Sequence, residues 1–166
     1  MSALATRPRP KLARDESRLR SERNVAPIVA AVDGSAASRA AIGEAVRLAG
    51  ELSAPIVFVY VRRGPARVFG APVYQRRLTT EMARARRVLD RALTAADSAG
   101  VPAEGEILEG SPRRRISEFA RDRSARLIVV GFRPRKPAQS VSTGVRRSAG
   151  RPFIVARSIP QLTAAA

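Results

Sequence analysis

Short apolar runs alternate along this chain with longer segments of helical periodicity, and this alternation restricts the fold more than any other feature. The runs are too short for helices and rich in Val and Ile, as strands buried on both faces of a parallel sheet require. They occupy 27–32, 55–61, 104–109, 126–131 and 152–156. Helical patterns lie between them at about 36–53, at 74–99, from 112 onward and at 141–149. The order predicts a doubly wound α/β domain with right-handed crossovers.

Local signals support these boundaries. Ser35 is placed to cap the first helix, and Ser111 to cap the third, with Pro112 at its first helical position. Gly100 follows the second helix as the residue that closes it. The segment 62–72 is expected to be a loop, and the alternating run at 104–109 is expected at a sheet edge.

The absence of Cys and His removes several kinds of chemistry. Disulfides, thiolate nucleophiles, serine–histidine catalysis and His-containing metal sites are all excluded. The composition leaves a carboxylate-only site for Mg²⁺ open. We predict no catalytic residue, no metal and no enzymatic activity.

The chain carries a formal net charge of +17, from 31 basic and 14 acidic residues, and all basic residues except Lys11 and Lys136 are Arg. One interpretation is an anionic partner such as nucleic acid or another polyanion. The other is an Arg-biased composition on a solvated surface. Arg77, Arg84 and Arg91 lie seven residues apart on one helix face, so the helix at 74–99 carries a basic stripe.

The apolar pattern divides the chain into three parts. Residues 1–24 are charged and broken by prolines, which predicts a disordered basic tail. The folded domain is expected at 25–158, and 159–166 is expected to be a flexible tail. No apolar run approaches the ~20 residues that span a membrane, so we expect no membrane partner and a cytoplasmic protein.

Ligands of doubly wound sheets bind beyond the carboxyl ends of the strands, where the strand order reverses. This rule selects Asp33, Val61 and Gly131, which end three of the runs. The chain contains no P-loop, and Asp-Gly-Ser-Ala-Ala-Ser stands where a dinucleotide fingerprint needs three glycines. It also lacks the phosphoacceptor Asp and the Lys of a response-regulator receiver.

The remaining motifs carry a family resemblance. Val32-Asp-Gly-Ser35, the helix opened by Gly110-Ser-Pro112, Ile128-Val-Val-Gly131 and Pro152-Phe-Ile-Val155 occur in the order and spacing of universal stress proteins. The resemblance covers about 26–157. It implies a five-stranded sheet of order 3-2-1-4-5 in a Rossmann-like three-layer sandwich, similar to adenine nucleotide α-hydrolases. It also implies that Asp33 and Val61 hold an adenosine.

The phosphate loop of that family, G-x2-G-x9-G-[ST], is degenerate here. Gly131 matches its first glycine, but Pro134 takes the second position and has no N–H to donate. Counting back from the last strand instead places Ser140 and Ser142 where the family has its final serines, to cap the last helix or touch a phosphate. Three basic side chains, Arg133, Arg135 and Lys136, are candidates to hold an anion in place of the lost glycines.

Two classes of function therefore remain. The first is a universal-stress-type regulatory protein with weak or lost ATP binding, which dimerises through the last strand, Phe153, Ile154, Val155 and Ala156. No cofactor is expected, although ATP or AMP, held by a modified phosphate loop, stays an alternative. The second is sequence-independent binding of nucleic acid or another polyanion on the same fold.

Overall fold

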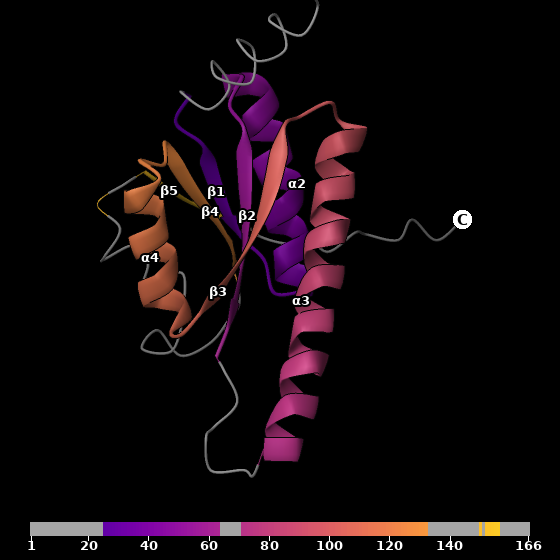
Figure 1. The fold of residues 1–166 in the computed structure, drawn as a ribbon. Coiled ribbons are helices and arrows are strands. Elements are labelled where there is room, and N and C mark those ends of the chain that lie inside the picture. The colour runs from indigo at the N-terminus through magenta and orange to yellow at the C-terminus, as the bar shows by residue number, and fades with distance from the viewer. Residues whose placement is uncertain (1–24, 64–70, 133–149, 151, 157–166) are drawn as a thin grey trace, which may run out of the picture.

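The computed structural model describes residues 25–63, 71–132, 150 and 152–156 (Figure 1). These residues form five strands and three helices. The strands are β1 (Ile28–Ala31), β2 (Ile56–Arg62), β3 (Ala103–Glu109), β4 (Leu127–Gly131) and β5 (Phe153–Ala156). The helices are α2 (Ala36–Leu52), α3 (Ala71–Ser98) and α4 (Pro112–Asp122).

The sheet is parallel throughout, with strand order β3-β2-β1-β4-β5, as the sequence predicted. Ala31 of β1 pairs with Val59 of β2 and with Val130 of β4. The direction of strand addition reverses at β1, because β2 and β3 lie on one side of it and β4 and β5 on the other. The carboxyl ends of β1, β2 and β4 therefore meet at one edge of the sheet.

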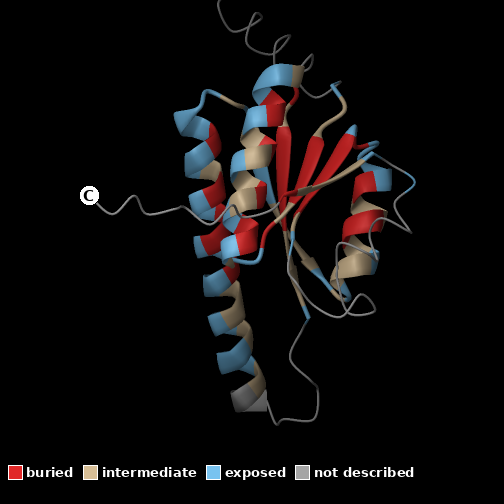
Figure 2. Ribbon diagram, turned by 180° about the vertical axis from the view of Figure 1, so that it is seen from behind, coloured by how far each residue is buried: buried red, intermediate tan, exposed pale blue. Residues whose placement is uncertain are grey.

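Helices cover both faces of the sheet, which gives the expected three layers. On one face α2 and α3 pack over a core that includes Ile28, Ile56 and Phe58. On the other face α4 packs through Ile116 and Ala120 on Val29 and neighbouring strand residues. Figure 2 shows the buried residues concentrated in the central strands and on the inner sides of the helices. The alternation of strand residues between the two cores is what fixes the register.

Two local expectations were wrong. Helix α3 begins at Ala71, so Pro72 lies in its first turn, where a missing N–H costs nothing, and does not belong to the preceding loop. Ser111 does stand at the N-cap of α4, but its side chain makes no capping hydrogen bond.

Other local expectations are confirmed. Ser35 caps α2 through its side chain, Gly100 has a φ of +68°, and β3 lies at the sheet edge. The tails at 1–24 and 159–166 and the helix expected at 141–149 lie outside the described residues. Among the helices that the structure describes, none is long and apolar enough to cross a membrane.

Candidate functional site

The candidate site lies at the carboxyl edge of the sheet, where β1, β2 and β4 end. Val32 continues the ladder beyond β1, because its N–H donates to the Val59 carbonyl at 2.9 Å. Asp33 is the next residue, Val61 lies two residues beyond Val59 in β2, and Gly131 ends β4. The structure thus brings the three residues that the sequence selected to the same edge.

Asp33 organises the turn from β1 into α2. Its Oδ1 accepts the N–H of Ser35 at 2.9 Å, which is the geometry of an Asx turn. Gly34 lies between them with a φ of +81°, a conformation that favours glycine. The Asp33 side chain is exposed to solvent. It therefore shapes the turn and remains accessible to solvent at the carboxyl edge of the sheet.

Ser38 is a member of this turn that the sequence analysis missed. Its hydroxyl oxygen accepts the Asp33 N–H at 3.1 Å, and its own N–H donates to the Ser35 hydroxyl at 3.1 Å. The residue is only 3% exposed. The Ser-x-x-Ser spacing after Asp33 resembles a capping box, and this signal would have found it.

Gly131 brings α2 and β4 into direct contact. A Cβ at this position would lie 2.3 Å from the carbonyl oxygen of Ala37 and 2.4 Å from its carbonyl carbon. Only glycine therefore allows the first turn of α2 to pack against the end of β4. The glycine that matches the first position of a phosphate loop thus also has a packing role, which fixes the amino end of α2 beside the crevice.

Val61 belongs to the face of the sheet that α4 covers. It is half-buried and packs against the core that contains Val57 and Val59. Phe132, which follows β4, is 38% exposed, and its N–H donates to the Ala156 carbonyl at 2.8 Å. The carboxyl edge on this face therefore ends in incompletely covered apolar side chains, which suit the flat surface of a base.

The phosphate side of the predicted site lies outside the described residues. This applies to Arg133, Arg135, Lys136, Ser140 and Ser142. Gly131 and Phe132 are the last described residues before that segment. The contacts that we predict between an anion and the three basic side chains or the two serines therefore stay predictions.

The predicted arginine stripe lies on α3, on other residues than those that end the strands. Arg77, Arg84 and Arg91 are exposed on α3, which packs on the face of the sheet opposite to α4. The structure therefore divides the predicted site residues into two groups. Asp33, Val61 and Gly131 share the carboxyl edge, and the stripe forms its own surface.

No group of three or more acidic side chains that could hold a metal ion occurs within the described part of the chain. The chain has no His and no Cys to extend such a group. The chemistry of the described edge is therefore that of hydrogen-bond acceptors, backbone amides and apolar surface.

The fold and its carboxyl edge define a class of protein. It is the class of doubly wound α/β domains with a crevice where the strand order reverses. The family model of the universal stress protein family matches residues 24–157. The chain therefore belongs to the universal stress protein family. No curated protein matches it in sequence.

Solved structures of the family superpose on most of this chain. Universal stress protein UspA from Lactobacillus plantarum is 29% identical, with a TM-score of 0.68 over 80% of this chain and 98% of that one. A family protein from Burkholderia pseudomallei is 29% identical, with a TM-score of 0.62 over 77% of this chain and 93% of its own. The universal stress protein from Archaeoglobus fulgidus in complex with dAMP is 26% identical, with a TM-score of 0.62 over 78% and 96%.

Proposed function

We propose that this chain is a regulatory binding protein of the universal stress type, which holds the adenosine part of a nucleotide weakly and acts as a homodimer. Catalysis forms no part of the proposal, because the chain has neither His nor Cys to activate a nucleophile. The cytoplasm is the proposed location.

The adenosine side of the crevice carries the proposal. Asp33 is exposed just beyond the end of β1, and the half-buried Val61 follows the buried Val57 and Val59 on the α4 face of β2. A carboxylate beside an apolar floor provides one acceptor for polar groups of the nucleoside and one surface for its base. The similar protein from Archaeoglobus fulgidus holds dAMP.

The phosphate side gives the reason for expecting weak binding. Tight phosphate loops use glycines so that several backbone N–H groups reach the same anion. Here Pro134 replaces one of these glycines and supplies no N–H. We therefore expect the β- and γ-phosphates of ATP to add little affinity beyond that of AMP.

Isothermal titration calorimetry with AMP and ATP tests this proposal. We expect AMP to bind with a dissociation constant on the order of 100 μM and ATP to bind within tenfold of it, a difference below about 1.4 kcal/mol. Asp33→Ala should abolish the AMP signal. The control Asp97→Ala removes an exposed carboxylate at the end of α3 and should leave the AMP signal unchanged.

Two results would overturn the nucleotide proposal. ATP bound more than tenfold tighter than AMP would show that a modified phosphate loop works, which is the alternative function. If AMP gave no heat at protein concentrations well above 100 μM, the adenosine side of the crevice would not bind a nucleotide either.

The dimer proposal rests on β5. It is the last strand of the sheet, paired on one side with β4, and its other edge carries no partner among the described residues. The N–H of Ile128 donates to the Pro152 carbonyl and that of Phe132 to the Ala156 carbonyl. Because backbone groups alternate along a strand, the groups of Phe153 and Val155 face away from β4. These groups are free to pair with the same strand of a second copy.

Val155→Pro tests the dimer, since it removes an outward N–H and none of the β4–β5 hydrogen bonds. Light scattering after gel filtration should give a dimeric mass for the wild type and a monomeric mass for the variant. Circular dichroism should show the same secondary structure in both. A monomeric wild type, or a variant that remains dimeric, would overturn the proposed interface.

A further inference from the structure

We propose that the exposed face of α3 binds the phosphate backbone of duplex DNA without sequence specificity. The proposal concerns the arginine stripe, here defined as Arg76, Arg77, Arg84, Arg87 and Arg91. It does not rest on nucleotide binding in the crevice, because none of these arginines belongs to the proposed nucleotide site.

The stripe is one narrow face of a long helix. At 3.6 residues per turn its five arginines fall within an arc of roughly 100°, and they extend over about 22 Å of helix. Each of them is exposed. The acidic residues of the helix, Glu81, Asp90 and Asp97, fall outside this arc. The negative charges of α3 are therefore segregated from the stripe.

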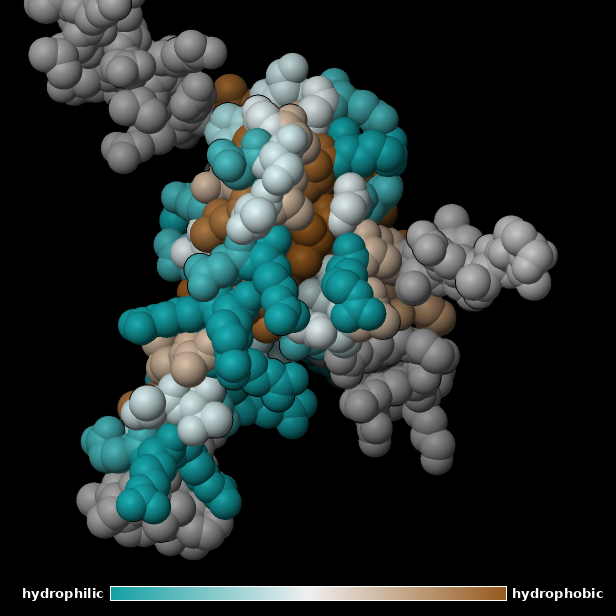
Figure 3. Space-filling view, turned by 90° about the vertical axis from the view of Figure 1, so that its right-hand side faces the viewer, coloured by the Kyte–Doolittle hydropathy of each residue, from teal (hydrophilic) through white to brown (hydrophobic). Residues whose placement is uncertain are grey.

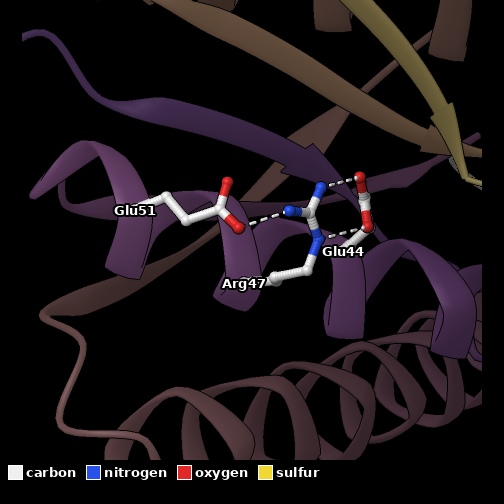
Figure 4. Close-up of polar contacts among 3 residues, drawn as sticks. All are labelled: Glu44, Arg47 and Glu51. Carbon is white, nitrogen blue, oxygen red and sulfur yellow. Dashed lines mark hydrogen bonds and ion pairs between the residues drawn. The ribbon is translucent and has the colours of Figure 1, made fainter.

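Five arginines elsewhere in the described structure form ion pairs with neighbouring glutamates. Arg47 of α2 donates to both oxygens of Glu44 and, at 2.5 Å, to Glu51 (Figure 4). The side-chain hydrogen bond to Arg47 lowers the pKa of Glu44. Four further arginines, on or next to β2 and α4, are also ion-paired: Arg62, Arg114, Arg115 and Arg123.

Four of the five stripe arginines differ from these ion-paired arginines. Among the described residues, Arg76, Arg84, Arg87 and Arg91 make no ion pair within 4.0 Å. An unpaired guanidinium keeps its full capacity for bidentate contact with a phosphate. Arg39, Arg63, Arg86, Arg121 and Arg126 are also exposed and outside the ion pairs of the described residues, so the stripe is set apart by the gathering of four such guanidinium groups on one helix face.

The position of α3 gives a long polymer access to the stripe. The amino-terminal part of the helix extends beyond the sheet (Figure 1), and no described side chain from 74 to 84 is fully buried. Seen from the α3 side, hydrophilic side chains gather along this extension (Figure 3). A straight row of about 22 Å matches roughly six base pairs of a duplex at 3.4 Å per step.

The surface between the arginines favours a phosphate backbone over an acidic protein. Thr80, Thr94 and Ala95 fall on the same arc, and no aromatic or large exposed apolar side chain lies there among the described residues. Protein interfaces depend on such apolar anchors for most of their affinity. Phosphate contacts need only charge, and they carry no sequence information.

Fluorescence anisotropy of a labelled mixed-sequence duplex, titrated with the full chain over a series of KCl concentrations, tests the proposal. With four to five phosphates neutralised, the slope of log K against log salt should be about −4. Arg84→Gln combined with Arg91→Gln should reduce that slope by about 2. Between 50 and 200 mM KCl the variant should then lose about tenfold less affinity than the wild type.

A control variant that loses the same number of charges from another surface separates the effect of the stripe from the effect of net charge. Arg121→Gln combined with Arg126→Gln removes two exposed charges from α4 and from the segment before β4. This control should keep the wild-type slope. The proposal would be overturned if both variants reduced the slope of log K against log salt equally, or if the wild type did not bind the duplex at low salt. It would also be overturned if polyglutamate at equal charge displaced the duplex.

Discussion

Replacing Gly131 by Ala tests the contact between α2 and β4 that holds the candidate crevice together. The added Cβ would lie 2.3 Å from the Ala37 carbonyl oxygen. Ordinary contacts lie near 3.5 Å, so the first turn of α2 must retreat by about 1 Å. The two nearest atoms are the carbonyl oxygen and the carbonyl carbon of Ala37, which belong to the backbone, so no side-chain rotation relieves the overlap. Overpacking of this kind typically costs 1–3 kcal/mol, and we expect about 3 because a helix must move.

Urea unfolding followed by circular dichroism measures this effect, since the chain has no Trp for fluorescence. With a slope of about 2 kcal/mol per molar urea, a loss of about 3 kcal/mol lowers the midpoint by about 1.5 M. The same displacement moves the Asp33 turn, so AMP binding should weaken with it.

Gly43→Ala is the matched control. This glycine lies inside α2, and a Cβ there would meet nothing within 4 Å. The substitution should raise stability by up to about 1 kcal/mol, because alanine favours the helix. If Gly131→Ala left the urea midpoint unchanged, or raised it as Gly43→Ala should, the close packing of α2 against β4 at Gly131 would be refuted.

Four further substitutions test the turn, the end of α3 and the ion pair of α2. Ser38→Ala removes the acceptor of the Asp33 N–H and should cost about 1 kcal/mol in urea unfolding; an unchanged midpoint would contradict that hydrogen bond. Gly34→Ala should cost about 2 kcal/mol, since φ is +81° and the Cβ would lie 2.9 Å from Val88 Cγ2. Gly100→Ala, with positive φ but open space, should cost less, and equal losses would refute the contact with Val88. Glu44→Gln should lower the midpoint slightly at neutral pH. The folded-state pKa of Glu44 lies below its ordinary value of 4.5, so this stabilisation is present above 4.5 and lost as the pH falls through the lowered pKa. The wild-type and variant midpoints should therefore converge in acid, and a difference that persists there would argue against the ion pair.

The strands could be predicted because their residues satisfy local and long-range demands together. The run Ile128-Val-Val130 favours extended backbone and is also buried on both faces of β4. The Asp33 turn could be predicted for a similar reason, because its hydrogen bonds join residues only two to five positions apart. The family resemblance then supplied the strand order.

Features that depend on distant neighbours could not be predicted. The packing role of Gly131 requires the carbonyl of Ala37, which is far away in sequence. The ion pairs Arg62–Glu109 and Arg123–Glu104 join separate elements, so no local pattern indicates that these arginines are neutralised. Ser111 was expected to cap α4 from its identity and position, but side-chain capping also depends on a rotamer that sequence does not specify.

Mass spectrometry of the protein as purified, under native conditions, tests the central claim most directly. The claim is that the crevice keeps its adenosine side, at Asp33 and Val61, without a phosphate loop that retains ATP. The spectrum should show the dimer of the bare chain with no stoichiometric ATP, while added AMP at millimolar concentration should shift the mass. Recovery of one ATP per chain would contradict the claim.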